Sequence, residues 1–588
     1  MKKLLSFFLA AWMILSISCP AFAEERPVLT IGDTKNRAGE RVDGEDQFGI
    51  WRYLEDQLGV EIEFVYLSPD DYASALTSGK LPDIVITNNN LSEILENGLA
   101  LNVEPYLEKY VPNLLKGEVG LTYRVFKELM NDGEGFYFFP EQIGSNGVGH
   151  SNEPYNRGYV VRWDYYRELG YPPINNEDDY LNVLRQMHAN HPFTEEGYPT
   201  YLYGFNNHSG YSTAFRAELS LNYWVAYKYQ NNIFTNEVFD GYADPAHSMW
   251  WTSMAWFNKL YQAGKEDGSF DMDVFSQTTA QHEIKCARGQ YLGLHNGKDT
   301  FYNESIKNAP DTLAGYGTVP SAAANYCTNV YQLLGNGSAF MWFISANSPH
   351  REAALRLFNY MCDPDFLRSA ALGQQGVTWD YNADGVPYLN EFGKEQLTAY
   401  MAGKAAPDNY YVRWGTYDAL TDRWPLMRRS MLHPDGYPLD FVTISREYEI
   451  ASMTNNISRD ICAHYTVELP SDAFYNVGSL DYRNDCGEAI SSCMSGGLNR
   501  DQLNILSSAE AVMEDVWMDL VLAETEAEWN KLRDETVQKV IQLGEPAVFE
   551  AYREKWDAAA AVIVPMARQA QSANGIELYT PEQYAGHP

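Results

Sequence analysis

Residues 78–87 read SGKLPDIVIT and contain two adjacent structural signals. The final four, IVIT, form an uninterrupted apolar run, as in strands buried on both faces. The preceding residues 69–78 have a helical pattern that begins at Pro69 and ends at Gly79. Proline favours the first helical turn and glycine favours a helix end. This stretch therefore predicts a helix followed by a buried strand.

Similar segments alternate upstream. Residues 28–31 and 61–67 read as strands, and residues 48–58 as a helix that stops at Gly59. The strand–helix–strand–helix–strand order predicts an α/β fold with a mostly parallel sheet. Ligands of such sheets bind beyond the carboxyl ends of the strands, where Asn88 and Asn89 stand in this chain.

A second α/β block begins near residue 159. Its signals are a strand at 159–162, a helix at 164–169 that stops at Gly170, aromatic-rich helices around Trp224 and Trp250, and a strand at 291–294. Residues 314–320 read as a crossover, 339–344 as a buried strand and 351–361 as an amphipathic helix. The last third of the chain, with periodic stretches at 514–522 and 526–543, is expected to be largely helical.

Composition excludes several classes of protein. The chain has 588 residues, 45% of them hydrophobic, and 79 acidic against 43 basic residues, for a net charge of −36. The length indicates several domains or lobes, and the apolar fraction excludes a disordered chain and a polytopic membrane protein. The strong negative charge argues against nucleic-acid binding.

Residues 1–23 have the features of a signal peptide. Lys2 and Lys3 precede an apolar stretch at 4–17, and AFA at 21–23 offers a cleavage site. Cys19 raises the alternative of a lipid-modified cysteine, but the serines and isoleucine before it and Pro20 after it suit a lipoprotein signal poorly. We therefore favour soluble export.

In an exported protein the cysteines can form disulfides or remain free thiols. Those after the signal peptide are Cys286, Cys327, Cys362, Cys462, Cys486 and Cys493. We expect one or two disulfides with the rest buried thiols, and the last two are close enough to form a local loop. There is no C-x-x-C pair with histidine partners, so a zinc site is not expected.

Enzyme motifs are missing. We find no G-x-S-x-G, H-E-x-x-H, G-x-x-x-x-G-K-[ST] or G-x-G-x-x-G after a strand. The many acidic residues still leave a glycosidase-type carboxylate pair as an alternative, because such a pair is defined in space.

One segment matches a calcium-binding pattern. Asp380, Asn382, Asp384 and Glu391 fit D-x-[DN]-x-[DN]-G-x5-E. The competing interpretation is a β-hairpin whose turn contains Asp384-Gly385, a strong turn pair. We favour the hairpin, because a proline follows where a calcium loop usually has an aliphatic residue.

Aromatic residues are abundant, with 42 Tyr, 26 Phe and 14 Trp. Flat rings stack on the apolar faces of sugars, while amides, carboxylates and guanidinium groups bind the hydroxyls. The candidates for this role on expected loops are Trp51, Trp163, Trp224, Trp379 and Trp414, each with core packing as an equal alternative. Trp250, Trp251 and Trp256 lie at helical spacing and are expected in the core.

Five segments, taken in order, resemble those of the extracellular solute-binding proteins of ABC importers, a family dominated by sugar binders. SGKLPDIV at 78–85 is similar to its SG-x-LPDI segment, and RWDYYRELG at 162–170 to its R-K-D-W-L-x-K-L-G element. Residues 345–361 resemble its S-x-N-S-P strand-to-helix step, 373–377 its G-x-x-G turn, and 526–552 its terminal helices. The resemblance covers nearly the whole chain after residue 23.

This resemblance implies a two-lobed, periplasmic-binding-protein-like α/β fold. Each lobe would be a mostly parallel sheet flanked by helices, with hinge crossovers and a helical C-terminal portion. We expect residues 24–147 and 320–395 in the N-terminal lobe, and 148–319 and 396–588 in the C-terminal lobe. The implied ligand contacts are Asn88, Asn89, Asp46, Trp51, Arg162, Asn207, Trp224, His295, Asn296 and Trp414, with Asp33 a weaker candidate.

The implied function is an extracytoplasmic receptor rather than an enzyme. It would capture a carbohydrate, with an oligosaccharide preferred, and deliver it to the membrane permease of an ABC transporter as a monomer. The alternatives are a peptide or another polar metabolite as solute, or a secreted carbohydrate-active enzyme. No cofactor is expected, with calcium in the loop at 380–391 as the weaker alternative. Some relatives carry a calcium loop after the RWDYYRELG helix, but residues 191–197, HPFTEEG, do not suit one. We expect the protein in the periplasm or at the cell surface.

Overall fold

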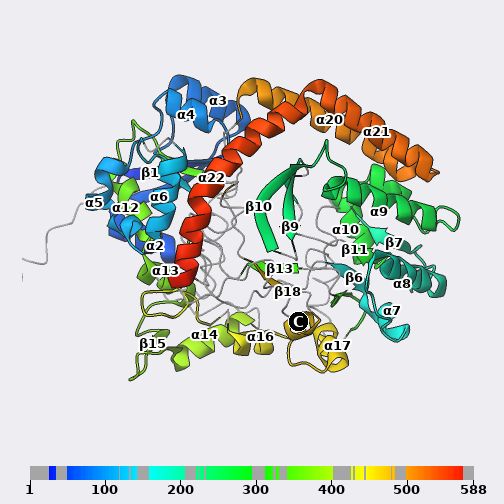
Figure 1. Cartoon of the computed structure of the whole chain (residues 1–588). Coiled ribbons are helices and arrows are strands. Elements are labelled where there is room, and N and C mark those ends of the chain that lie inside the picture. The colour runs from blue at the N-terminus through cyan, green and yellow to red at the C-terminus, as the bar shows by residue number, and fades with distance from the viewer. Residues whose placement is uncertain are drawn as a thin grey trace, which may run out of the picture.

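The computed structural model describes residues 26–34, 49–117, 119–130, 134–140, 142–143, 158–205, 220–222, 224–230, 233–294, 312–321, 326–329, 341–401, 426–427, 431–442, 445–453, 455–477, 480–483, 490 and 498–573. The predicted signal peptide lies outside these ranges. The two largest β-sheets of the described part are separate and have helices around them, on the left and right of Figure 1.

The first sheet contains the strands that the sequence predicts. Its order is β2 (Glu61–Tyr66), β1 (Val28–Asp33), β3 (Ile84–Thr87), β14 (Met341–Ile344) and β4 (Phe139–Pro140). β2, β1 and β3 are parallel, whereas β14 is antiparallel to both of its neighbours. The predicted buried strands at 84–87 and 339–344 are confirmed, since every residue of β3 and β14 is buried.

Local signals explain the helices of this lobe. α3 (Pro69–Ser78) begins where the Ser68 hydroxyl accepts a hydrogen bond from the Asp71 amide, at 3.2 Å. It ends at Gly79, whose φ of 66° is the left-handed conformation that glycine adopts without strain. α2 (Gly49–Leu58) and α12 (Arg351–Met361) also match the predicted helices. α12 packs against β14 and α2, and Phe358 on it stacks on Phe139 of β4 at 3.8 Å.

The second sheet has the order β12 (Tyr316–Val319), β6 (Tyr159–Arg162), β11 (Tyr291–Leu294) and β7 (Tyr201–Gly204). β11 and β7 are parallel, and β6 runs antiparallel to both β11 and β12. The predicted crossover at 314–320 is therefore a strand of this sheet. α7 (Trp163–Glu168), α8 (Glu177–Asn190), α9 (Met249–Gly264) and α10 (Thr279–Ala287) surround the sheet (Figure 1).

The expected helix around Trp224 is wrong. β8 (Ser220–Asn222), β9 (Val225–Gln230) and β10 (Ile233–Asp240) form a three-stranded antiparallel sheet there. The last four residues of β9, YKYQ, alternate tyrosine with polar residues at a period of two, which suits a strand and not a helix. The expected helix around Trp250 is confirmed as α9.

Two short parallel pairs join early and late parts of the chain. β5 (Gln142–Ile143) pairs with β17 (Leu426–Met427), and β13 (Tyr326–Asn329) with β18 (Leu480–Arg483). β5 lies between β4 of the first sheet and β6 of the second in chain order, and β13 lies between β12 and β14. β5 and β13 therefore belong to segments of the chain that pass from one lobe to the other.

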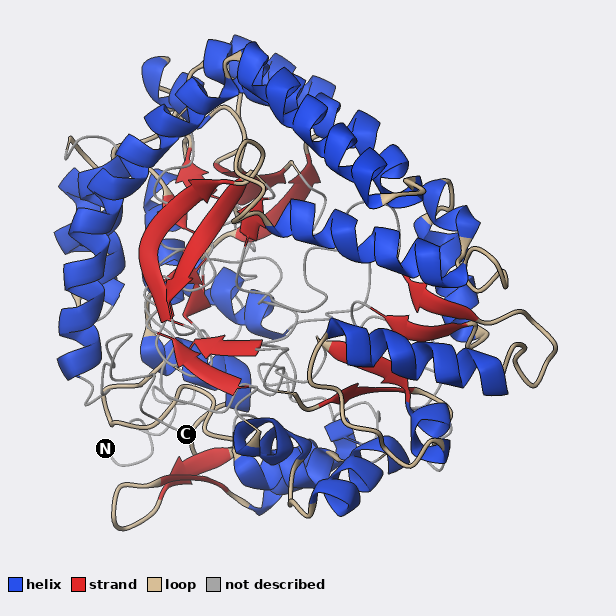
Figure 2. Ribbon diagram, turned by 45° about the vertical axis from the view of Figure 1, so that its right-hand side comes forward, coloured by secondary structure: helices blue, strands red, loops and turns tan. Residues whose placement is uncertain are grey.

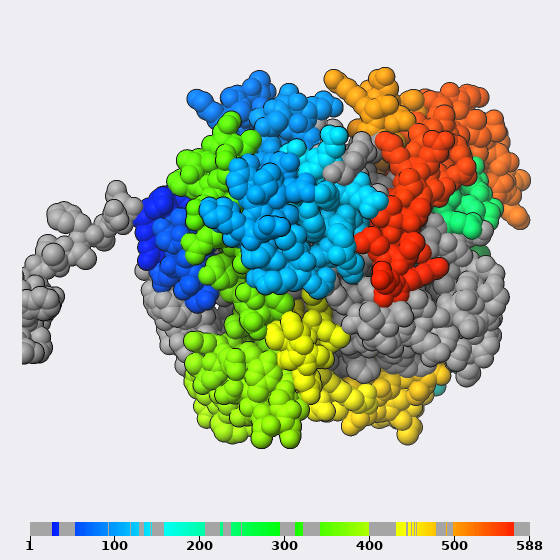
Figure 3. Space-filling model, turned by 60° about the vertical axis from the view of Figure 1, so that its left-hand side comes forward, coloured from blue at the N-terminus to red at the C-terminus, as the bar shows by residue number. Residues whose placement is uncertain are grey.

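Three long helices complete the described chain, as the last third of the sequence predicts. α20 (Arg500–Leu522) and α21 (Glu526–Leu543) form an antiparallel pair, and α22 (Glu545–Ala573) follows after Gly544. α20 packs on α9 of the second lobe, whereas α22 packs on β10 and on α6 (Val119–Met130) of the first. Figures 1 and 2 show these helices passing over both sheets, and Figure 3 shows α22, in red, beside the first lobe. We call α20, α21 and α22 the strap.

One connected apolar core, from Leu29 in β1 to Ala567 in α22, links the two lobes and the strap. Trp250, Trp251 and Trp256 lie in it, as predicted from their helical spacing. No helix within the described ranges is both long and apolar enough to cross a membrane.

Candidate functional site

The carboxyl-end edge of the first sheet is the candidate site. β1 and β3 end at Asp33 and Thr87, and Asn88 and Asn89 follow β3 as exposed residues. Asp33 is 1% exposed. Asn88 and Asn89 therefore lie at the edge where parallel sheets bind ligands, whereas the Asp33 side chain lies inside the lobe.

Hydrogen bonds fix the loop that carries these asparagines. The Asn89 amide donates to Oγ1 of Thr87 at 3.1 Å, and the Tyr72 hydroxyl donates to the Asn89 carbonyl at 3.1 Å. Asn90 adopts the left-handed conformation, with φ 61°, and its side-chain amide donates to Glu93 at 2.8 Å. The main chain is thus held from both sides, while the side chains of Asn88 and Asn89 face solvent.

A pocket of about 340 Å³ opens beside this loop, between α3 and the start of α4 (Leu91–Glu96). Its apolar wall includes Leu67 and Leu76, and its polar rim includes Thr34, Asn89 and Glu93. Burial raises the pKa of Tyr72, so its phenol stays a neutral hydrogen-bond donor. An apolar wall with amide, carboxylate and hydroxyl groups at its rim suits a neutral polyhydroxylated ligand. Sequence reasoning missed Tyr72 and Glu93, although both stand one helical turn inside helices that follow strands at this edge.

Arg162 is the last residue of β6. This strand runs antiparallel to β11, with Val160 opposite Leu294, so Arg162 lies near the start of β11. His295 and Asn296, which follow β11 in the sequence, lie outside the described residues, so a common site with Arg162 stays a prediction.

The contacts of Arg162 are those of a structural residue. Its guanidinium donates to both carboxylate oxygens of Asp164, at 2.9 and 3.0 Å, and to the Gly289 carbonyl at 2.8 Å. It also lies over the Tyr165 ring at 4.3 Å and is 4% exposed. These contacts tie β6 to α7 and to the loop before β11.

Trp224 is a packing residue and not a loop residue open to a ligand. It is 4% exposed, and its indole lies against Phe549 and Tyr552 of α22, with ring centroids 5.8 and 5.0 Å away. Its Nε1 donates to Glu545. The expected stacking role is thus corrected to a contact between the region of β9 and the strap.

Two further tryptophans are also buried. Trp163 is 0% exposed and donates from Nε1 to Asp460 at 2.9 Å, and Trp379 is 3% exposed and donates to the Gly373 carbonyl at 2.7 Å. The alternative of core packing is therefore the right one for both. Trp51 belongs to α2 and not to a loop.

Comparison with known proteins identifies the fold. No family model and no curated protein sequence matches the chain. Among solved structures, an HMO-binding solute-binding protein associated with an ABC transporter of Bifidobacterium longum infantis matches with a TM-score of 0.57 at 14% identity, over 91% of this chain and 99% of that one. An extracellular solute-binding protein of Bifidobacterium longum subsp. infantis matches with 0.53 at 13% identity, over 91% and 98%. The alginate-binding protein AlgQ2 matches with 0.52 at 13% identity, over 92% and 100%.

The chain has the fold of an extracellular solute-binding protein. The two sheets described above are the cores of its two lobes, so the expected two-lobed α/β architecture with a helical C-terminal part is confirmed.

Several predicted contacts of this solute-binding fold lie outside the described residues. These are Asp46, Asn207, His295, Asn296, Trp414 and the side chain of Trp51. They stay predictions.

The segment that matched a calcium loop is a hairpin. β15 (Trp379–Tyr381) and β16 (Pro387–Leu389) pair antiparallel, and Gly385 has a φ of 77° in the turn. The side-chain oxygen of Asn382 accepts hydrogen bonds from the amides of Asp384 and Val386, both at 2.9 Å. The favoured hairpin is therefore confirmed. Within the described ranges, no group of three or more His, Cys, Asp or Glu side chains is arranged to hold a metal ion.

Cys286, Cys362 and Cys462 are buried thiols. Burial raises the pKa of the first two well above the usual range, which keeps them protonated. Cys486 and Cys493 lie outside the described residues, so the local disulfide stays a prediction.

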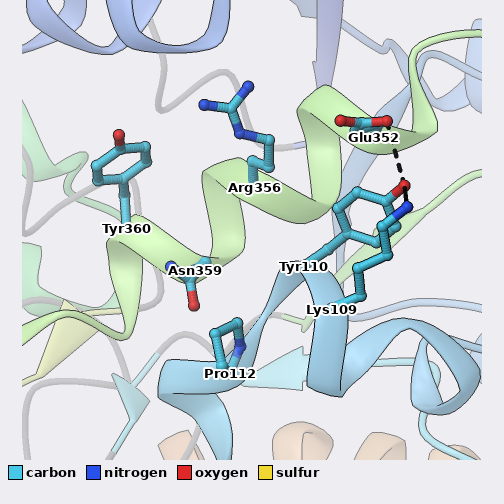
Figure 4. Close-up of a pocket in the computed structure, with 7 residues that line it drawn as sticks. All are labelled: Lys109, Tyr110, Pro112, Glu352, Arg356, Asn359 and Tyr360. Carbon is cyan, nitrogen blue, oxygen red and sulfur yellow. Dashed lines mark hydrogen bonds between the residues drawn. The ribbon is translucent and has the colours of Figure 1, made fainter.

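A second recess, of about 400 Å³, lies on the outer face of the first lobe between α5 (Leu107–Tyr110) and α12 (Figure 4). Lys109 donates to the Tyr110 hydroxyl at 2.6 Å, which donates to Glu352 at 3.2 Å. Arg356 donates to the Gln57 carbonyl at 3.0 Å. These polar groups are thus engaged in hydrogen bonds within the protein, whereas the side chains of Asn88 and Asn89 are exposed.

Proposed function

We propose that the protein is an extracytoplasmic solute-binding receptor. It captures an oligosaccharide between its two lobes and delivers it to the membrane permease of an ABC transporter. The observation that carries this proposal is the match of the fold over about nine tenths of the chain to solute-binding proteins of carbohydrates. The first of these binds HMO, AlgQ2 binds alginate, and a further similar structure, FusA of S. pneumoniae, is in complex with kestose.

The candidate site supports a carbohydrate as solute. Asn88 and Asn89 present donors and acceptors to solvent, and the adjacent pocket joins an apolar wall to a polar rim. Sugars combine hydroxyl groups with apolar C–H faces, so they need both kinds of surface. An amino acid as solute would instead require paired cationic and anionic groups for its two charges.

We assign residues 24–147 and 320–395 to the N-terminal lobe, and 148–319 and 396–588 to the C-terminal lobe. The strap belongs to this second set, although α22 also packs on α6 of the first lobe. Asp46, Asn207, His295, Asn296 and Trp414 remain proposed contacts of the solute, in addition to Asn88 and Asn89.

The proposed mechanism is a shift between open and closed lobes. A solute that contacts both lobes binds the closed state better, so its binding raises the closed population. No bond is broken, so the chain needs binding groups and no nucleophile. The predicted signal peptide and the acidic surface fit an exported protein that reaches its permease by diffusion.

Thermal-shift measurements on the chain from residue 24 test the proposal. The panel contains kestose, alginate oligosaccharides, HMO and a peptide mixture. A ligand at a hundred times its dissociation constant stabilises the folded state by about 2.7 kcal/mol, which raises the midpoint visibly. We expect a saturable shift with an oligosaccharide that is recovered unchanged. A response to peptides alone would overturn the choice of solute, and cleaved sugar would show an enzyme.

Asn88→Ala and Asn89→Ala test the site with the same readout. Both side chains are exposed, so the variants should keep their unliganded midpoint and lose at least tenfold in affinity for the responding sugar. Asn504→Ala, at an exposed position of α20, is the matched control and should bind as the wild type does. Equal binding by all three variants would show that Asn88 and Asn89 do not contact the sugar.

A further inference from the structure

A buried and a half-buried carboxyl group meet where the strap joins the β9–β10 hairpin. Glu545 is the first residue of α22 and is 0% exposed. It accepts a hydrogen bond from Nε1 of Trp224 and faces Asp240, the last residue of β10. The two carboxyl groups thus come from segments separated by about 300 residues of chain, and two adjacent anions would repel each other strongly in a buried site.

Burial raises the pKa of Asp240, and hydrogen bonds offset part of this effect. Its Oδ1 accepts hydrogen bonds from the amides of Tyr242 and Ala243, at 3.0 and 2.9 Å. On the other carboxyl group, Oε2 of Glu545 is buried and has no hydrogen-bond partner within the described part of the chain. Burial, and next the charge of Asp240, raise the pKa of Glu545 to about 8. The hydrogen bond from Trp224 acts in the opposite direction, and burial outweighs it.

The contact between Glu545 and Asp240 lies where the strap connects the two lobes. The hydrogen bonds of Asn258 on α9 to the carbonyls of Val521 and Ala523, at 3.0 and 2.8 Å, fasten the turn between α20 and α21 to the second lobe. α22 then leads from β10 to α6 of the first lobe. Glu545 stands at the beginning of the segment that spans the two lobes.

We propose that a proton held between Glu545 and Asp240 fastens α22 to the β9–β10 hairpin, and that loss of this proton loosens the strap between the lobes. The protonated Glu545 donates to the Asp240 carboxylate and accepts from Trp224, so each partner is satisfied. When the proton leaves, the two carboxylates repel each other within the core. The fastening depends on the fold, and only its effect on solute capture rests on the proposed function.

Other titratable groups surround the pair. Asp244, in the loop after β10, adds negative charge near Asp240, and His247 pairs with Asp244 at 2.7 Å. Tyr552 on α22 packs against Trp224. Imidazole side chains change charge between about pH 5 and 8, so His247 needs its own control.

Glu545→Gln is the central variant, because glutamine copies the protonated carboxyl at every pH. The folded-state pKa of Glu545 lies above its ordinary value of 4.5, so the wild type loses stability as the pH rises from about 4.5 to about 8. We expect the thermal midpoint of Glu545→Gln to rise relative to the wild type across this range and then stay constant. Glu554→Gln, on the exposed face of α22, and His247→Gln should keep the wild-type difference between pH 5 and pH 9.

Hydrogen exchange at pH 6.5 and pH 9 locates the effect. After correction for the intrinsic rate, amides in the first two turns of α22 should exchange faster at pH 9 in the wild type and not in Glu545→Gln. Asp240→Asn keeps the acceptor for Tyr242 and Ala243 and removes the charge, so it should also reduce the pH response. It provides the test if Glu545→Gln does not fold.

Parallel pH profiles for the wild type and Glu545→Gln would overturn the proposal, as would a pH response of exchange that is uniform along α22. Neither measurement contains a solute. A failure here therefore leaves the receptor function untouched, and a failure to find a sugar ligand leaves this result valid.

Discussion

Asp83 accepts hydrogen bonds from groups that lie far from it in the chain. The amide and hydroxyl of Thr30 on β1 donate to Oδ2 at 2.9 and 3.0 Å, and the Ser348 hydroxyl donates to Oδ1 at 2.6 Å. His350 lies 3.1 Å from the same Oδ2. The aspartate of the SGKLPDIV segment thus holds β1 and the start of α12 to β3, which gives this segment a structural role beside the exposed asparagines that follow it.

Replacement of Asp83 should destabilise the protein in a pH-dependent way. Burial alone would raise the pKa of Asp83, but the hydrogen bonds from Ser348, Thr30 and His350 outweigh it and lower this pKa. The stabilisation is therefore present above the ordinary pKa of 3.8 and is lost as the pH falls below it. We expect Asp83→Asn to cost about 1–3 kcal/mol at pH 7 in urea unfolding, and less at pH 3. A similar loss at both values, or none beyond that of exposed Asp557→Asn, would contradict this.

Arg368 is a second residue whose hydrogen bonds hold distant segments of the chain together. It is 0% exposed, pairs with both carboxylate oxygens of Asp435, and donates to the carbonyls of Tyr437 and Pro438 at 3.1 and 2.9 Å. It joins α13 (Pro364–Leu372) to the segment 431–442. Buried ion pairs that lose one partner leave an uncompensated charge.

Arg368→Met should therefore cost about 3–5 kcal/mol in the free energy of unfolding, because Asp435 would stay inside without its cation. Exposed Arg553→Met on α22 should change it by less than about 1 kcal/mol. Chemical denaturation of both variants at pH 7 measures the difference. Equal costs would show that Asp435 gains water or another partner.

At the scale of elements, the sequence predicts best what short-range interactions decide. The residue range of α12 and the end of α3 at Gly79 agree with the sequence analysis, because helix ends depend on side chains within one turn. The direction of β6 is not a local property, so the sequence could place Arg162 at a strand end but could not tell which edge of the sheet that end would join. Trp224 was misjudged for a similar reason, since its partners on α22 are more than 300 positions away.

The β15–β16 hairpin provides a prediction at this scale. The Asn382 side-chain oxygen already accepts two amide hydrogen bonds, so it is not free to bind a cation. We expect calcium and a chelator to leave the thermal midpoint unchanged, and Asn382→Ala to lower the stability by about 1 kcal/mol through the lost turn bonds. A calcium-dependent midpoint that Asp384→Asn abolishes would instead show that the loop rearranges around the ion.

At the scale of the whole molecule, the two sheets, the short parallel pairs and the strap give each lobe more than one connection to the other. The proposed closure on a solute must therefore move several connections together. The sugar that raises the thermal midpoint should also reduce the radius of gyration in solution scattering, with Asn88→Ala requiring a higher concentration for the same change. An unchanged radius at saturation would mean that the lobes are already closed without solute.

The return of α22 to the first lobe has a further consequence for affinity. A helical tie between two moving bodies limits how far they separate, so the strap restricts the range of open conformations. The apparent dissociation constant of a receptor equals its intrinsic value divided by the fraction of molecules already competent to bind. A strap that holds the lobes closer together raises the fraction of molecules competent to bind, and a loosened strap lowers this fraction. In the proposed receptor, variants that alter only α22, outside the proposed solute contacts, are therefore a means to tune how tightly the solute is held.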